Sequence, residues 1–390
     1  ESSSCEIEII THGLKVNYQR ESKSAWLTDW YINGPTSLLL FDGITRRKIS
    51  EECSRERLYQ NVTFHSIKTR NISRGSSCDF LKVKADDLEF IITKVPEGIG
   101  PRWSSNIGIE YHECMSGIPK VDERERIGEF CSFIFGRHLL PVGYTIYDEE
   151  GYPIEEYARN PWGNNVRSLC SEPDIPPVRL NGDLTSGSKI RSLISKLLPS
   201  YLKLNKHLHL SESLWLYWIA RSMPIGTSLP LYAAAIERIM NEWFKYKKTK
   251  TRGVYISKDE FCKLLYDEIK AIKKNLQGKQ YGDKILSRIQ DAYQMTITDR
   301  FRFFFREIDL DVRDREWEAI HARHKVAHGR IEFDEKEILK YIRHTWTYDT
   351  LVHKIVLRLL GYSGDYIDRS DVEWKDEILL PSKVKVELDF

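Results

Sequence analysis

The residues best suited to chemistry lie between positions 315 and 330, where three histidines and three arginines surround a glycine. Histidine titrates near neutral pH and can give or take a proton, whereas arginine stays charged and offers a planar fork of donors to a phosphate. On a helix, His321, His324 and His328 would share one face, because they are spaced three and four residues apart. These residue types suit the cleavage of a phosphodiester, and a helix must hold them.

An arginine followed after four intervening residues by a histidine occurs at Arg323 and His328. So short a pair arises readily by chance, and its surroundings have to support it. The two residues are five positions apart, which is about 140° around a helix and roughly 7.5 Å along it, so one ideal helix cannot point both at a single atom. Either both side chains bracket a groove, or a second subunit completes the site.

The helix that must carry this pair is marked by its apolar residues and its end. Trp317, Ile320 and Val326 recur among polar residues, and Gly329 stands where a helix would end in the left-handed conformation. The pattern predicts a helix over residues 313–328 whose last turn is an exposed rim.

Length and composition favour a soluble globular protein with two or three domains. The chain has 390 residues, of which 41% are hydrophobic and 30% charged. The formal net charge of +2 gives no global attraction for nucleic acid, so any basic surface must be local. No apolar run approaches the roughly 18 to 20 residues that span a bilayer, and the first residues form no signal peptide. We expect a cytoplasmic protein without a membrane partner.

The seven cysteines are an odd number without paired short spacings, which argues against both a disulfide framework and a zinc ribbon. A reducing compartment fits this usage. His112, Cys114 and His138 match no established zinc-ligand spacing. We therefore expect no metal and no cofactor.

Short runs rich in β-branched and aromatic residues recur through the first 120 positions, separated by glycine, asparagine, aspartate and serine. This pattern predicts antiparallel strands, with a hairpin that turns at residues 85–87. The tryptophans Trp26, Trp30 and Trp103 should pack in the core or at its edge. The predicted strands are 6–10, 14–18, 25–32, 37–41, 62–69, 88–95 and 107–112.

The period becomes helical between 122 and 135, where Ile127, Phe130 and Ile134 recur and Gly136 follows as a stop. A strand over 139–148 comes next. Prolines and glycines then accumulate between 160 and 188, and few contacts should cross such a segment. We predict an N-terminal domain over residues 1–185, α+β and mainly β, that senses or positions a ligand.

From residue 186 to 390 the pattern predicts an all-α bundle of antiparallel helices, which makes the whole chain an α+β protein of two domains. A capping box at residues 257–260 opens one of its helices. A charged tail follows Gly361, with a β-like ending over 383–390. The predicted helices are 190–198, 214–219, 229–247, 257–275, 280–306, 313–328 and 334–360.

The surroundings of Arg323 and His328 resemble the HEPN superfamily, in particular its ApeA-like branch. The pair lies late in an all-α region and is followed by Gly329 and a long helix that ends at Gly361-Tyr362. The stretch Leu231-Tyr-Ala-Ala-Ala-Ile-Glu237-Arg looks like the first core helix of that branch, with its glutamate. The resemblance covers residues 190 to 365, and residues 128–136 are similar to the amino-terminal domain of ApeA-like proteins.

The resemblance implies a metal-independent endoribonuclease that acts as a homodimer, with the two motifs facing each other across a shared RNA cleft. Relatives of this kind serve in antiphage defence by abortive infection and cut tRNA or other cellular RNA. The expected partners are therefore RNA, with tRNA among the candidates, and a phage-derived trigger. Some HEPN domains are not nucleases, so the alternative is a non-catalytic module that binds RNA, nucleotide or a protein partner.

The residue types fit this chemistry. Cutting RNA without a metal needs a base for the 2′-hydroxyl proton, a cation for the phosphate and an acid for the departing 5′-oxygen. We expect His328 to act as that base or acid and Arg323 to clamp the phosphate. Two helix ends that meet at a twofold axis would let the arginine and the histidine come from different subunits.

Four further residues are assigned supporting roles. His324 is expected to orient the site or contact phosphate, and Glu237 to hold Arg323 in position. Lys325 and Arg330 are expected to bind substrate through their positive charges.

Three competing interpretations stay open. The three histidines can simply form packing or interface surface. His324 and His328 also have the spacing of a metal-ligand pair, as in a metal-dependent hydrolase, with Glu318 or Glu332 nearby but no H-E-x-x-H pattern.

A looser pair, Arg315 and His321, is the third interpretation. It would lie in the middle of the helix, and Arg315 is followed by an acidic residue that would compete with phosphate.

Overall fold

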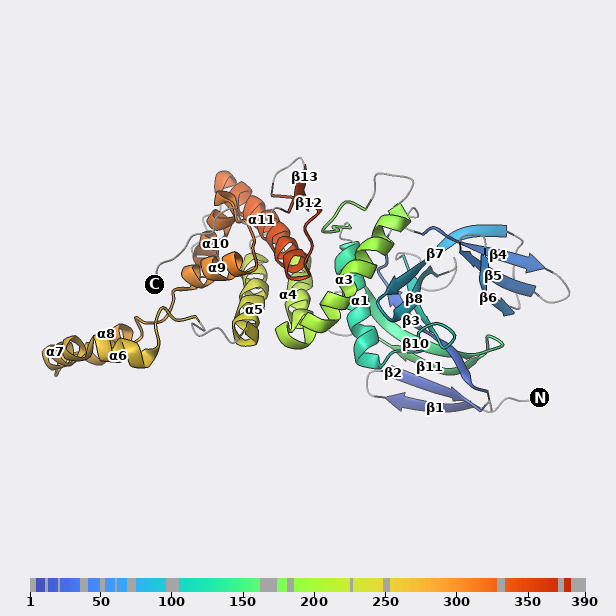
Figure 1. Cartoon of the computed structure of the whole chain (residues 1–390), viewed down its shortest axis with the longest axis horizontal. Helices are drawn as coiled ribbons and strands as arrows, with labels where there is room; N and C mark the ends of the chain where they lie inside the picture. Colours follow the sequence, from blue (N-terminus) through green and yellow to red (C-terminus); the bar gives the residue numbers. More distant parts are fainter. Residues whose placement is uncertain are drawn as a thin grey trace.

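The computed structural model describes residues 5–10, 13–19, 22–35, 41–49, 53–59, 62–68, 75–95, 105–161, 174–180, 186–224, 227–247, 253–327, 334–370 and 375–379 of the chain. Strands dominate before residue 160 and helices after residue 186 (Figure 1). The predicted mixed α+β class is confirmed. The division at residue 185 and the HEPN character of the bundle stay predictions.

Eleven strands form one antiparallel sheet in the order β1-β2-β11-β10-β3-β9-β8-β7-β4-β5-β6. They are β1 Cys5–Ile10, β2 Gly13–Tyr18, β3 Ser24–Ile32, β4 Gly43–Ile49, β5 Cys53–Tyr59, β6 Val62–Lys68, β7 Gly75–Ala85, β8 Leu88–Lys94, β9 Ile107–His112, β10 Leu140–Asp148 and β11 Pro153–Arg159.

Seven of the predicted strands agree with β1, β2, β3, β6, β8, β9 and β10 to within one residue at each end. The predicted strand 37–41 falls almost wholly outside the described residues. Three strands, β4, β5 and β11, were missed, because runs such as 46–48, 55–57 and 155–156 are charged and break the alternation of apolar and polar residues.

The predicted hairpin joins β7 and β8, and it is confirmed. Ala85 pairs with Leu88, and Asp86 has a positive φ of 49°. Aspartate tolerates this left-handed conformation, which the tight turns of hairpins require.

The tryptophans of the sheet are packed, as predicted, where the structure describes them. Trp26 is buried and stacks on Tyr147 with a centroid separation of 4.9 Å. The indole N–H of Trp30 donates to the Thr145 hydroxyl at 2.9 Å. Trp103 lies outside the described residues.

One face of the sheet is covered by α1 (Val121–Phe135). Ile109 and Tyr111 of β9 are fully buried in the same hydrophobic cluster as Ile127 and Phe130 of α1. The helix ends at Gly136 with φ 65°, as predicted, and a Cβ there would lie 1.9 Å from the carbonyl carbon of Ile175. Only glycine fits this stop.

The second half of the chain supplies nine helices within the described residues, and none of the chain's described helices has both the length and the apolar character needed to cross a bilayer. They are α3 Ser186–Leu208, α4 Leu210–Ser222, α5 Leu229–Lys247, α6 Lys258–Leu264, α7 Tyr266–Leu276, α8 Gly282–Gln290, α9 Ile297–Glu307, α10 Asp314–Ala327 and α11 Glu335–Leu359.

Four of the predicted helices were wrong in extent: 190–198 and 214–219 are only parts of α3 and α4, and two others are each divided in two. The predicted 257–275 helix breaks at Leu265 into α6 and α7, although the start of the helix is capped as predicted: the Ser257 side chain accepts from the Glu260 N–H at 3.1 Å. The predicted 280–306 helix is α8 and α9, separated by a turn. Thr296 caps α9 by accepting from the Asp299 N–H at 3.2 Å, a start signal that the apolar period concealed.

The chain after α11 forms a two-stranded hairpin, β12 (Asp365–Asp368) with β13 (Lys375–Ile378). The sequence did not predict it. The expected β-like ending over 383–390 lies outside the described residues.

A single hydrophobic cluster runs from the sheet through α1 and α3 into the helices of the second half. Helix α3 contacts β7 and α1 on one side and α4 and α5 on the other (Figure 1). The sheet and the bundle therefore share a core.

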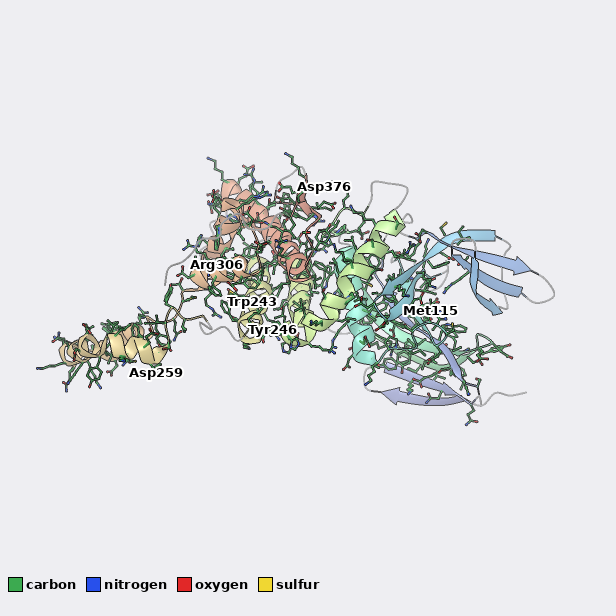
Figure 2. The ribbon with its side chains drawn as sticks, in the orientation of Figure 1. Met115, Trp243, Tyr246, Asp259, Arg306 and Asp376 are labelled. Carbon is green, nitrogen blue, oxygen red and sulfur yellow. The ribbon has the colours of Figure 1, made fainter. Side chains whose placement is uncertain are left out.

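Helices α6, α7 and α8 form an arm that projects from the body (Figure 1). Figure 2 shows the side chain of Asp259 on this arm and that of Trp243 inside the helical body. No residue of α7 is buried, and the main contacts of the arm are between α7 and α8.

Candidate functional site

Helix α10 places Arg323 on its inner face. Glu316, Ala319, Ile320 and Arg323 are all buried and recur every three or four residues, so they form one stripe against the bundle. His321 lies outside this stripe and is exposed. The arginine of the motif therefore points inward rather than to the rim.

Arg323 meets Glu237 of α5 in an ion pair, in which Nη1 of the arginine donates to Oε1 of the carboxylate. The structure thus brings together two residues that lie 86 positions apart and that the sequence placed in one site. Only 7% of Arg323 is exposed, whereas the side chain of Glu237 is 35% exposed. Solvent reaches this pair from the side of the glutamate.

Two aromatic rings complete the surroundings of Arg323. Its guanidinium carbon lies 5.3 Å from the centroid of the Phe301 ring of α9, a cation–π arrangement. Burial lowers the pKa of Arg323, and the phenol of Tyr348 on α11 opposes that shift. Burial also raises the pKa of Tyr348, against the opposing effect of the guanidinium. At neutral pH the arginine is therefore charged and the tyrosine neutral.

Helix α10 is fixed to α11 by a second, fully buried ion pair. Nζ of Lys354 lies 2.8 and 3.0 Å from the two carboxylate oxygens of Glu316, and it also donates to the Asp311 carbonyl at 2.9 Å. A buried pair of this kind costs several kcal/mol when one partner is removed. It sets the register of the helix that carries Arg323.

Arg315, the arginine of the looser pair, has other partners. It forms an ion pair with Asp368 of the β12–β13 hairpin and lies 3.8 Å from Glu377. Arg313 pairs with the same two carboxylates. These contacts tie the start of α10 to the hairpin, so Arg315 has a structural role here.

The other motif residues are described only in part. His321 is exposed, with its ring 6.2 Å from that of Trp317. His324 and Lys325 belong to the last turn of α10, but their side chains lie outside the description. His328 and Arg330 lie beyond the described residues, so the position of His328 relative to Arg323 stays a prediction.

Two residues of α11 near this site were missed by sequence reasoning. Tyr348 interacts electrostatically with Arg323, and His344 lies one turn earlier on the same face of α11. His344 is buried, its Nε2 atom has no hydrogen-bond partner among the described residues, and burial lowers its pKa, with Lys340 adding to the shift. The signal was present, because Tyr341, His344 and Tyr348 recur at helical spacing.

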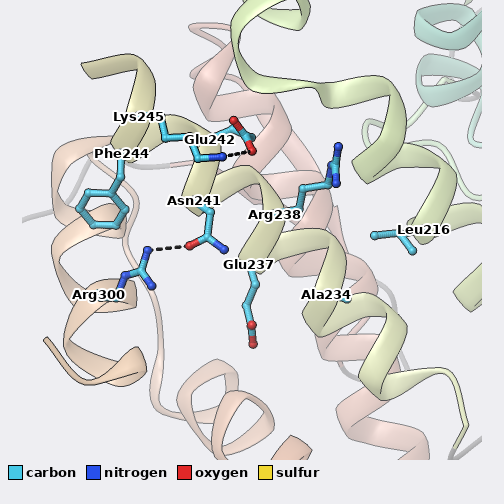
Figure 3. Close-up of a pocket in the computed structure, with 9 residues that line it drawn as sticks. All are labelled: Leu216, Ala234, Glu237, Arg238, Asn241, Glu242, Phe244, Lys245 and Arg300. Carbon is cyan, nitrogen blue, oxygen red and sulfur yellow. Dashed lines mark hydrogen bonds and ion pairs between the residues drawn. The ribbon is translucent and has the colours of Figure 1, made fainter. Parts of the chain in front are cut away.

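A pocket of about 700 Å³ opens next to Glu237 on the outer face of α5 (Figure 3). Its wall includes Glu237, Arg238 and Asn241 of α5 together with Arg300 of α9. Figure 3 shows Arg238 and Arg300 on either side of Asn241. Positive charge is thus gathered beside the carboxylate that holds Arg323.

The described residues contain no group of three or more histidine, cysteine or carboxylate side chains placed to hold a metal ion. His112 is buried and stacks on Trp26, while His138 stacks on Trp218. The side chains of His324, His328 and Glu332 are not described, so the metal interpretation of that trio is untested.

Comparisons with known proteins returned no match. No protein-family model matches the chain. No curated protein matches it. No solved structure matches it either.

Proposed function

We propose that the chain is a metal-independent endoribonuclease of the HEPN type, which serves as a cytoplasmic antiphage effector by abortive infection. The observation that carries this proposal is the ion pair of Arg323 with Glu237. Both residues were singled out from a sequence resemblance, and their contact supports a docked motif helix.

The proposed reaction is an internal transfer of the phosphoryl group from the 5′-oxygen to the 2′-oxygen. His328, as base, removes the proton from the 2′-hydroxyl; the 2′-oxygen bonds to phosphorus while the bond to the 5′-oxygen breaks, and an acid returns a proton to that oxygen. The products are a 2′,3′-cyclic phosphate and a 5′-hydroxyl. Arg323 stabilises the charge that accumulates on the phosphate oxygens.

Glu237 acts as a positioning residue in this scheme. It neutralises Arg323 at rest, so a phosphate that reaches the arginine has to share it with the carboxylate. His324 would orient the site, and Lys325 and Arg330 would bind the RNA strand. A homodimer would form each site from Arg323 of one subunit and His328 of the other, and a phage-derived trigger would bring the subunits into this arrangement.

The burial of Arg323 favours a second candidate, a non-catalytic HEPN module that binds RNA, nucleotide or a protein partner. An arginine that is 7% exposed and already paired can serve packing alone. The two candidates differ in whether RNA is cut.

The test is incubation of the purified chain with total RNA in EDTA, beside three variants. His328→Ala and Arg323→Ala should each lower the cleavage rate by at least about 100-fold, because each removes a group that acts in the transition state. His321→Ala, which changes an exposed histidine of the same helix, is the matched control and should cut at the normal rate.

Mixing the two inactive variants tests the shared site. If arginine and histidine come from different subunits, each mixed dimer has one intact site out of two. Because about half of the dimers in an equal mixture are mixed, about a quarter of normal activity should return. No recovery would contradict the composite site, as would a monomer at micromolar concentration by light scattering. RNA left uncut under all activating conditions would sink the nuclease proposal, and cleavage that requires added zinc or manganese would favour a metal hydrolase.

A further inference from the structure

The pocket beside Glu237 holds more positive charge than its own carboxylates neutralise. Lys245 is paired with Glu242 at 2.8 Å, and Glu237 is paired with Arg323. Arg300 and Arg238 remain. Neither makes a hydrogen-bonded ion pair with a carboxylate in the part of the chain that the structure describes.

Arg300 is held in place by uncharged partners. Its Nη2 donates to the amide oxygen of Asn241 at 2.6 Å, and its guanidinium carbon lies 5.3 Å from the centroid of the Phe244 ring. Its Nε is buried without a hydrogen-bond partner among the described residues, and burial lowers its pKa. A guanidinium with one neutral acceptor and an aromatic ring is fixed in orientation but lacks a counter-charge.

Arg238 is the second cation of the pocket, and among the described residues its ion pair with Glu212 is not a hydrogen-bonded one. Its Nε is also buried without a partner in the described structure, and the nearest carboxylate oxygen, of Glu212, is 3.6 Å from Nη2. That separation is too long for a hydrogen bond. Arg238 and Asn241 are three positions apart on α5, so both present to the same pocket.

We propose that this pocket binds a phosphate group of the RNA strand, on a nucleotide next to the one at Arg323. The inference rests on the proposed ribonuclease function. Two guanidinium groups offer the paired donors that match phosphate oxygens, and a fixed arginine loses little freedom when it binds. Glu237 lines the pocket and also holds Arg323, so a strand seated here is led to the candidate site.

The test uses a short fluorescein-labelled 2′-O-methyl oligonucleotide, which lacks the attacking hydroxyl and cannot be cut. Its binding to the full chain is measured by fluorescence anisotropy across a range of salt concentrations. Arg300→Gln with Arg238→Gln should weaken binding by at least about 10-fold, since charge-assisted hydrogen bonds to phosphate are lost. The slope of log affinity against log salt should fall by about 0.7 for each phosphate contact removed.

Arg302→Gln is the matched control, because it removes the same charge from the same helix at a side chain that is 65% exposed and outside the pocket. It should bind as the unaltered chain does. Arg300→Lys keeps the charge but not the fork and should bind with intermediate affinity. If Arg300→Gln lowers the unfolding temperature, Arg238→Gln and Arg300→Lys decide the question.

Unaltered affinity and salt slope in the double variant would overturn the proposal. The proposal would also be overturned if binding of a free mononucleotide required both arginines while binding of the oligonucleotide did not. The pocket would then bind an effector. The proposed function can fail independently of the phosphate pocket. If oligonucleotide binding requires both arginines but natural RNA is never cut, the nuclease proposal is contradicted and the phosphate pocket is supported.

Discussion

Arg323 illustrates at the level of one residue how a charge is kept inside a bundle. A guanidinium removed from water without a counter-charge costs several kcal/mol, so Glu237 fixes both its position and its charge. The same pair restrains the proposed chemistry, because phosphate has to compete with the glutamate. Phe301 stabilises the cation without competing for it.

His353 of α11 is a second buried residue whose charge state depends on its neighbours. It is fully buried, with Nε2 2.8 Å from the Tyr217 hydroxyl and Nδ1 3.2 Å from Nη1 of Arg369. Since Arg369 can only donate, Nδ1 accepts and Nε2–H donates to Tyr217, which donates in turn to Asp349 at 2.9 Å. This series of hydrogen bonds keeps His353 neutral.

Because His353 is neutral in the folded chain, we predict that the protein loses stability in acid. Burial lowers its pKa from 6.5 to about 3; Asp349 opposes the shift and Arg369 adds to it. Below pH 6.5 the His353 side chain is protonated in the unfolded chain but not in the folded one. The free energy of unfolding therefore falls as the pH decreases toward 3, by about 1.4 kcal/mol per pH unit.

Urea unfolding at pH 7.5 and 4.5 measures this effect against His353→Gln, which keeps a polar side chain but does not titrate. The pH-dependent loss should be smaller in the variant by about 3 kcal/mol. His321→Gln, on the exposed side of α10, controls for removing any histidine and should behave as the unaltered chain. Equal losses in all three proteins would contradict the assignment.

Among the elements, α5 and the arm mark what the sequence could and could not predict. The predicted bounds of α5, 229–247, match the structure, because its apolar period is long and unbroken. In the arm the period continues across Leu265 and across the 291–296 turn, where nothing local signals a break except the Thr296 cap. Strands β4 and β5 were missed because their charged residues hide the alternation.

The candidate site was also predicted only in part from the sequence. The Arg323–Glu237 contact was expected from the resemblance, since both residues belong to recognisable segments. The pocket was not expected, because Asn241 and Arg300 meet across 59 positions and neither belongs to a motif. Such a site depends on how α5 and α9 pack, which no local pattern encodes.

The arm should be separable from the rest of the fold. The chain leaves and re-enters the body side by side, with the Tyr255 N–H donating to the Tyr293 carbonyl at 2.8 Å and the Met295 N–H to the Gly253 carbonyl at 2.9 Å. Replacing residues 258–290 by a short glycine-serine linker should therefore change the unfolding free energy of the body by no more than about 1 kcal/mol.

Thermal unfolding and circular dichroism measure that outcome. The shortened chain should lose helical signal in proportion to α6, α7 and α8 and keep its unfolding temperature. A drop of more than about 5 °C, or aggregation, would show that the arm covers apolar surface of the body instead.

For the whole molecule, the decisive feature is the core that the sheet and the bundle share. Contacts cross the predicted boundary at residue 185 in several places: the Tyr201 hydroxyl lies 3.2 Å from Glu129, and Arg221 donates to the Gly136 carbonyl at 2.9 Å. Helix α3 lies after the predicted boundary, yet it contacts β7 and α1 as well as α4 and α5.

This shared core predicts one cooperative unfolding transition. Leu197 of α3 is fully buried in the hydrophobic cluster that the two parts share, so Leu197→Ala should destabilise both together by about 2 to 5 kcal/mol. Hydrogen exchange read by mass spectrometry, in increasing urea, follows peptides of β9 and α5 separately. Both should open at the same urea concentration and shift equally in the variant. Leu264→Ala, at a side chain that is 65% exposed on the arm, is the control and should shift neither. Two transitions, with only the α5 peptides responding to Leu197→Ala, would instead establish that residues 1–185 and 186–390 fold independently.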